Sequence, residues 1–169
     1  MADVPATPLV APYGDYSITT TNRVKIDMNA ITDDGDSPIL SYSLEVDDGR
    51  GGLLKPMYGV DTNSLSLTYT FSSGVQRGLT YRARYRSRNS VGWSGYSPIG
   101  YITASVKPSA PLTPTFIEAT STTIKINLWT SEDNGGSPII AYYLERDDGN
   151  SGAFQAVTTY SSPIEYLFD

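Results

Sequence analysis

One stretch of the sequence occurs twice, and a constant offset of 100 residues separates the two copies. Residues 33–49 read DDGDSPILSYSLEVDDG, and residues 133–149 read DNGGSPIIAYYLERDDG. The same offset places residues 24–26 (VKI) on residues 124–126 (IKI) without a gap. A repeat at a fixed period indicates that one structural unit is built twice along the chain, so the fold has to be a tandem arrangement.

The segment between the copies is rich in proline. Residues 105–114 read SVKPSAPLTP, and the three prolines favour a short, stiff and extended connection. A chain of 169 residues is long enough for two small domains. We therefore predict a complete domain over residues 1–106, with an N-terminal extension at residues 1–7, and an incomplete domain over residues 107–169.

Apolar and polar residues alternate within each copy. Val24, Ile26 and Met28 are separated by polar residues, and residues 65–71 (LSLTYTF) show the same period of two, which is typical of half-buried strands. No useful length of sequence has helical spacing, and clusters of Gly, Pro, Asn and Asp recur as turn signals. The pattern predicts an all-β protein with a sandwich or barrel architecture.

Charge and composition argue against several classes of function. The formal net charge is −6, which disfavours nucleic acid and anionic membranes as partners, because binding to phosphates depends on Lys and Arg. The chain has no Cys and no His, so Ser–His and Cys–His nucleophilic systems cannot form. No stretch approaches the roughly 20 apolar residues of a transmembrane helix, and the first residues lack the basic and apolar regions of a signal peptide. We expect no enzymatic activity, no cofactor, no metal site and no membrane insertion.

Residues 78–97 carry a family resemblance. They read GLTYRARYRSRNSVGWSGYS, which resembles the sixth strand and the following turn of a fibronectin type III domain. The repeated D-x-G-x-S-P-I-x-x-Y phrase is similar to that family's passage from its second to its third strand. The resemblance covers nearly all of residues 8–104 and about the first two thirds of a second domain. It implies two tandem immunoglobulin-like (fibronectin type III) β-sandwiches, the second of which lacks its last strands. The chain departs from the family pattern at Met28 and Leu128, where a core tryptophan is usual, and at Arg77, where a proline is common.

The resemblance also implies roles for two aromatic residues. Tyr81 matches the tyrosine corner, in which the ring is buried and its hydroxyl bonds to backbone near the preceding crossover. The alternative interpretation is a tyrosine that only packs in the core. Trp93 is a second candidate for a structural or interface role.

Four arginines alternate along the same segment, so their side chains should point to one face of a strand. They are Arg82, Arg84, Arg86 and Arg88. In the resembling fold this strand lies beside the one that carries Glu45 and Asp47. We favour cross-strand ion pairs with these acids, which contribute about 0.2–1 kcal/mol each. The alternative is a basic stripe that grips sulfated sugar or phosphate.

Several aspartates gather in the first copy and invite a calcium hypothesis. They are Asp33, Asp34, Asp36, Asp47 and Asp48. The spacing does not fit an EF-hand loop, because Ser37-Pro38 follows Asp36 where further ligands would be needed. Asp-Gly pairs are also ordinary turn chemistry, so we interpret these residues as turn residues.

The second copy stops soon after its repeated phrase. Residues 164–168 (IEYLF) parallel residues 67–71 (LTYTF), and nothing that follows corresponds to the last two strands of the first copy. A sandwich without those strands would expose one edge and an apolar face. Three explanations remain open for this second copy. The sequence is a fragment of a longer tandem array, or a neighbouring subunit supplies the missing strands by β-addition, or the second half is disordered. The interface candidates there are Tyr142, Leu144, Glu145, Tyr166 and Phe168.

These observations predict a non-enzymatic structural or interaction module of an extracellular or cell-surface tandem-repeat protein. One form of this prediction is a fibre subunit whose incomplete sandwich is completed by a neighbouring chain. The expected partners are other protein chains, either copies of the same chain or further repeats. The alternative is an adhesion module that binds glycan or protein through its arginine face or its turn loops.

Overall fold

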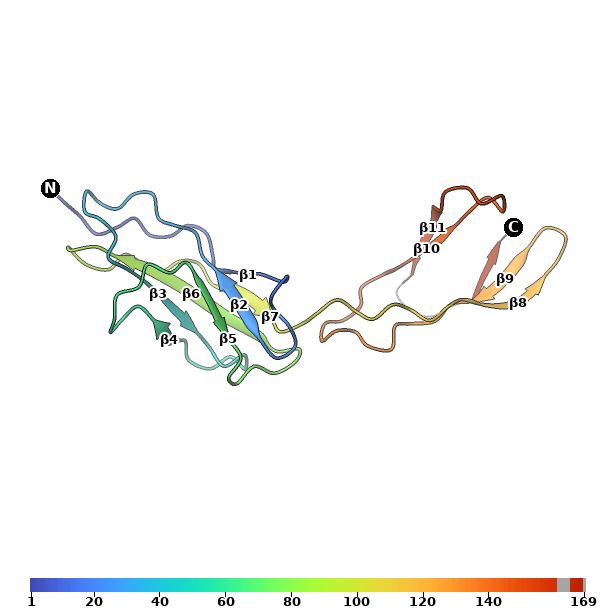
Figure 1. The fold of residues 1–169 in the computed structure, drawn as a ribbon, viewed down its shortest axis with the longest axis horizontal. Helices are drawn as coiled ribbons and strands as arrows, with labels where there is room; N and C mark the ends of the chain where they lie inside the picture. Colours follow the sequence, from blue (N-terminus) through green and yellow to red (C-terminus); the bar gives the residue numbers. More distant parts are fainter. Residues whose placement is uncertain (161–164, 169) are drawn as a thin grey trace. The chain divides into compact units, whose positions relative to one another are not determined.

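The computed structural model describes residues 1–160 and 165–168, and within them every regular element is a strand. The chain divides into two compact units, Met1–Val106 and Lys107–Asp169. In each unit the strands form two sheets. Figure 1 labels the strands from β1 to β11 in chain order. The predicted all-β fold with tandem sandwiches is thereby confirmed. No helix in the described part of the chain is long and apolar enough to cross a membrane.

The first unit contains seven strands in two antiparallel sheets. One sheet has the order β1-β2-β5 and the other the order β4-β3-β6-β7. The strands are β1 (Tyr13–Gly14), β2 (Val24–Asp27), β3 (Ser41–Val46), β4 (Lys55–Tyr58), β5 (Thr68–Phe71), β6 (Thr80–Arg88) and β7 (Gly100–Thr103).

The core of the first unit lies between these sheets and follows the period of two seen in the sequence. The inward residues of β2, β3 and β6 are fully or almost fully buried. They are Val24, Ile26, Tyr42, Leu44, Val46, Tyr81, Ala83 and Tyr85. Met28 is also buried, with 4% of its surface exposed, so a methionine fills the place where the family usually has tryptophan. Strand β3 departs from simple alternation, because all six of its residues are buried.

Residues 1–7, predicted as an N-terminal extension, lie against the first unit. The backbone N–H of Asp3 donates to the carbonyl of Gly35 at 2.8 Å, and the N–H of Ala6 donates to the carbonyl of Asp33 at 3.0 Å. The side-chain amide of Asn89 donates to the carbonyl of Asp3 at 2.6 Å and to that of Asp34 at 2.8 Å. The start of the chain is therefore fastened to the loop that precedes β3 and to the residue that follows β6.

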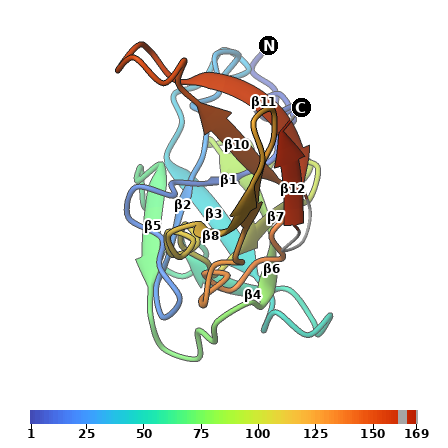
Figure 2. The same cartoon turned by 90° about the vertical axis from the view of Figure 1, so that its right-hand side faces the viewer.

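The second unit contains five described strands. Figure 2 shows the hairpin of β10 and β11, which forms one sheet, while the other sheet has the order β12-β9-β8. The strands are β8 (Thr115–Ala119), β9 (Ile124–Asn127), β10 (Tyr142–Arg146), β11 (Gln155–Tyr160) and β12 (Glu165–Phe168). The described part of the second unit thus contains regular strands, unlike the disordered state considered above.

The repeat extends to strand pairing. In β3 and β4, Leu44 is opposite Tyr58 and the register shifts between Leu44 and Glu45. In β10 and β11, Leu144 is opposite Thr158 and the register shifts between Leu144 and Glu145. Both the pairing and the irregularity recur with the offset of 100 residues.

The pairing of β12 with β9 is equivalent to that of β5 with β2, although the offset is 97 residues for β12 and 100 residues for β9. Phe71 of β5 is opposite Val24, and Phe168 of β12 is opposite Ile124. The predicted parallel between the two segments therefore holds for the backbone of residues 165–168. Ile164 lies outside the described residues.

The aspartates of the repeated phrase accept hydrogen bonds from backbone N–H groups in tight turns. The acceptor–donor pairs are Asp33–Gly35, Asp47–Gly49, Asp48–Arg50 and Asp48–Gly52 in the first unit, and Asp133–Gly135, Asp147–Gly149, Asp148–Asn150 and Asp148–Gly152 in the second. These bonds hold the pKa values of Asp48 and Asp148 below their usual range. Among the described residues, no group of three or more acidic side chains is arranged to hold a metal ion.

Candidate functional site

Two surfaces bring together the candidate functional residues, one on each unit. The first, called the arginine face, lies on the outer side of the four-stranded sheet of the first unit. It is formed by the four arginines of β6, by Glu45 and Asp47 of the neighbouring chain segment, and by Trp93 and Tyr96. The second, called the groove, lies in the second unit.

Ion pairs occupy two of the arginines on the arginine face. Arg82 Nε contacts Asp47 Oδ2 at 2.7 Å, and the backbone N–H of Arg82 donates to Asp47 Oδ1 at 2.9 Å. Arg84 Nη2 contacts Glu45 Oε2 at 2.7 Å. The structure therefore brings together the residues for which cross-strand ion pairs were predicted. These contacts also explain why β3 is buried on both faces.

Aromatic rings cover Arg84 and the two arginines that follow it on β6. The guanidinium carbon of Arg84 lies 3.8 Å from the ring centre of Tyr96, and that of Arg86 lies 4.6 Å from the ring centres of both Trp93 and Tyr96. That of Arg88 lies 5.0 Å from Trp93. Each contact of this kind contributes about 0.5–2 kcal/mol, depending on desolvation. The rings and guanidinium groups thus alternate along the strand.

Tyr96 was not among the residues predicted from the sequence. Its hydroxyl donates to Glu45 Oε1 at 2.6 Å, so Glu45 binds both Arg84 and Tyr96. Burial, together with this hydrogen bond, raises the pKa of Tyr96. One feature of the sequence could have indicated the role of Tyr96. Aromatic residues stand at positions 93 and 96, in a segment whose backbone runs along β6.

Arg86 differs from the other arginines of β6. It stacks between two rings, but no carboxylate pairs with it, and its Nε is buried without a hydrogen-bond partner. The Oγ of Ser43, which is opposite Arg86 on β3, is also buried without a partner. Arg88, by comparison, donates to Asn63 Oδ1. The Nε of Arg88 is likewise buried without a partner, and no acid pairs with Arg88 within the described residues. Arg86 is therefore distinguished by its position between two aromatic rings without an acidic partner.

Tyr81 lies on the opposite side of β6 and has a structural role. Only 1% of its surface is exposed, and its ring packs edge-on against Phe71. Its hydroxyl donates to the carbonyl of Gly74 at 3.2 Å and accepts from the N–H of Gln76 at 2.9 Å. This is the geometry that the resemblance implied for a tyrosine corner.

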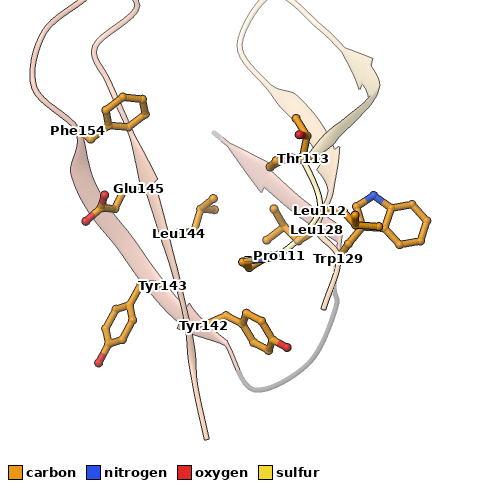
Figure 3. Close-up of a pocket in the computed structure, with 11 residues that line it drawn as sticks. Pro111, Leu112, Thr113, Leu128, Trp129, Tyr142, Tyr143, Leu144, Glu145 and Phe154 are labelled. Atoms are coloured by element: carbon orange, nitrogen blue, oxygen red, sulfur yellow. The ribbon is translucent and has the colours of Figure 1, made fainter. Parts of the chain in front are cut away.

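The groove of the second unit has a volume of about 460 Å³ and lies between its two sheets. Figure 3 shows Leu144 and Leu128 pointing into this space, whereas Tyr143 and Trp129 point away from it. The residues that line the groove are Pro111, Leu112, Thr113, Pro114, Leu128, Trp129, Tyr142, Tyr143, Leu144, Glu145 and Phe154. Most of these side chains are apolar, so the groove exposes the interior of the second sandwich.

Comparison of equivalent residues shows how open this interior is. Leu44 is fully buried in the first unit, and Leu144 retains 9% exposure in the second. The outward Glu45 is only 8% exposed, whereas the equivalent Glu145 is exposed. Phe154 at the groove is 66% exposed. The second unit therefore leaves apolar surface uncovered that the first unit covers.

The strand neighbours account for this difference. Strand β3 pairs with β4 on one edge and with β6 on the other, whereas among the described residues β10 pairs with β11 alone. Of the residues predicted as an interface, Tyr142, Leu144 and Glu145 come together at this edge and in the groove. Tyr166 and Phe168 pair through their backbones with Ile126 and Ile124 of β9, and their side chains lie outside what the structure describes.

Comparison with known proteins gives relatives by sequence and by structure. No family model matches the chain. Neural cell adhesion molecule 1 from Gallus gallus is 30% identical over 169 residues, covering 98% of this chain and 15% of that protein. Fibronectin type-III domain-containing protein 3a from Gallus gallus is 31% identical over 138 residues, covering 79% of this chain and 11% of that protein. The chain therefore spans only a small part of the length of these relatives.

Two solved structures share the fold. The sixth fibronectin type III domain of human fibronectin type III domain containing protein 3 has a TM-score of 0.51 and 18% identity, covering 67% of this chain and 96% of that one. The chicken CNTN1 FN1-FN3 domains have a TM-score of 0.50 and 14% identity, covering 98% of this chain and 57% of that one. These two likenesses show the fold. The sequence relatives, together with the repeated phrase and the sandwich topology, show that the chain belongs to the fibronectin type III family.

Proposed function

We propose that this chain is a non-enzymatic structural and interaction module of an extracellular or cell-surface tandem-repeat protein. The single observation that carries the proposal is the apolar groove beside the edge of β10. Exposed apolar surface next to an open strand edge is typical of protein–protein interaction sites. The relatives named for cell adhesion and for fibronectin type III domains support the same class of function.

The mechanism we propose is addition of a strand to β10. A strand from a neighbouring protein chain would form main-chain hydrogen bonds with β10, and its side chains would cover Leu144 and Leu128 in the groove. If copies of this chain contact one another head to tail without closing a ring, the product is a fibre. No catalytic step belongs to this proposal. On the arginine face, Asp47 and Glu45 are held in ion pairs with Arg82 and Arg84. The chain also has no His or Cys that could act as a general base or a nucleophile.

Sedimentation velocity on the full chain tests this proposal with copies of the chain as partners. We expect the sedimentation coefficient to rise with concentration, because the groove of one copy is covered by another. Replacing Phe154 and Leu112 with serine is expected to weaken association at least about tenfold, since each removes apolar surface at the groove. Both side chains are exposed, so the fold should persist.

The matched control for this test is Ile140→Ser. Ile140 is 89% exposed but does not line the groove, so its replacement should leave association unchanged. A folded chain that stays monomeric at every concentration would contradict self-association. An equal effect of the Ile140 and groove substitutions would show that the groove is not the interface.

Arg86 favours a second candidate function, which is binding of a sulfated glycan. Its guanidinium is held between Trp93 and Tyr96 without an acidic partner, so its remaining N–H groups suit an anionic ligand. Binding of a sulfated oligosaccharide, measured by calorimetry at low ionic strength, should be lost in Arg86→Ala and retained in Arg23→Ala. Equal binding by both variants would exclude this function for Arg86.

A further inference from the structure

We infer that the strand which pairs with β10 carries arginines at alternate positions and runs antiparallel to β10, with one arginine opposite Glu145. This inference rests on the proposed function, because it specifies the chemistry of the strand that the neighbouring chain supplies. The occupant is a polypeptide segment of the same type as β6, with arginine side chains facing outward and aromatic or small side chains facing the groove.

The register of the first unit supports this assignment. Glu45 is opposite Arg84, and Leu44 is opposite Tyr85, in the antiparallel pairing of β3 with β6. The β3–β4 and β10–β11 hairpins share their register and their irregularity with an offset of 100 residues. An antiparallel strand in the β6 register therefore places its residue equivalent to Arg84 opposite Glu145.

The acidic groups that would receive the arginines are already in place. Asp147 Oδ1 accepts from the N–H of Gly149 at 3.0 Å, as Asp47 Oδ1 accepts from Gly49 at 2.9 Å. In the first unit Asp47 also binds Arg82, and Glu45 binds Arg84. Glu145 is exposed, and it lines the groove. Two carboxylates at the edge of β10 thus match the spacing of alternate arginines on a paired strand.

The inward side chains set a second requirement. Figure 3 shows Leu144 pointing into the groove, and the equivalent Leu44 is opposite Tyr85 in the first unit. Arg146 of β10 is at the position equivalent to Val46, which points inward in β3. The inward side chains of β10 therefore resemble those of β3 only around Tyr142 and Leu144. An incoming strand should therefore bring an apolar side chain opposite Leu144, as β6 does with Tyr85.

A synthetic peptide with the sequence of residues 78–97 provides a direct test. It carries the β6 strand and the aromatic residues that follow it, and a fluorescent label would report its binding to the full chain by anisotropy. We expect saturable binding that weakens at least about tenfold in the Glu145→Arg chain, since an opposite-charge pair becomes a like-charge pair. A peptide with Arg84→Glu should bind the Glu145→Arg chain and regain the lost affinity.

Glu132→Arg is the matched control, because it makes the same charge change at an exposed residue that does not line the groove. It should leave binding of the unmodified peptide unchanged. Absence of saturable binding would overturn the inference, and so would equal affinity of the Glu145→Arg and unsubstituted chains. If the peptide fails while sedimentation shows association through the groove, the strand chemistry is wrong and the proposed function stands.

Discussion

Replacing Tyr81 with alanine is expected to lower the free energy of unfolding of the first unit by about 3–5 kcal/mol, the range for truncating a large buried aromatic residue. The ring is 1% exposed and packs against Phe71, so its removal leaves a cavity in the core. The substitution also leaves the carbonyl of Gly74 and the N–H of Gln76 without their partner. The first unit should therefore be mostly unfolded at temperatures that the unsubstituted chain withstands.

Urea denaturation followed by tryptophan fluorescence measures this loss for the first unit alone. The chain has two tryptophans, so a Trp129→Phe background leaves Trp93 as the reporter of the first unit. Tyr81→Phe keeps the ring and loses the hydroxyl, which should cost only about 1–2 kcal/mol. Tyr101 is 66% exposed, so Tyr101→Ala should change stability by less than about 0.5 kcal/mol. A loss from Tyr81→Ala no larger than that from Tyr81→Phe would argue against the packing role.

Replacing Asp47 with alanine is expected to lower the stability of the first unit by about 2–4 kcal/mol, as for the loss of one partner from a buried ion pair. The side chain of Asp47 is fully buried and accepts hydrogen bonds from Arg82 and from the N–H of Gly49. The Arg82 side chain is 31% exposed, so water can solvate the charge left behind. For this reason we expect Asp47→Ala to lower the stability of the first unit by less than the largest losses measured for fully buried ion pairs.

Asp147→Ala is the matched control. Asp147 is equivalent to Asp47 and accepts the same turn hydrogen bond, but no β6 arginine pairs with it among the described residues. Asp147 accepts from Gly149, so its replacement should cost the second unit about 0.5–1.5 kcal/mol. Trp129 in a Trp93→Phe background reports the second unit. Equal losses from the two aspartate substitutions would show that Arg82 adds little to the role of Asp47.

Much of the fold could be predicted because the repeat, the alternation and the turn residues are local properties of the sequence. The phrase at 33–49 predicts a turn, a strand and a further turn, and its copy at 133–149 has the same backbone pairing in the structure. Asp47 and Asp48 could be interpreted as turn residues because Asp-Gly pairs suit tight turns. The fold class follows from such signals together with the family resemblance of residues 78–97.

The candidate sites were less predictable because they depend on contacts between distant segments. The alternation of the four arginines predicts a common face, but it gives no sign that Tyr96 and Trp93 stack on them. Whether Arg86 has an acidic partner depends on Ser43, rather than an acid, being opposite it on β3. Likewise, the groove is lined by residues from 111–114 and by Phe154, which no periodicity links to β10.

The attachment of the first residues to the sandwich has a mechanical consequence. A tensile load applied at the amino end reaches the hydrogen bonds of Asp3 and Ala6 before it reaches β1, which is only two residues long. The amide of Asn89, next to the end of β6, holds the carbonyl of Asp3. Force therefore enters the unit at the four-stranded sheet, and the short β1 strand is shielded from being peeled away first.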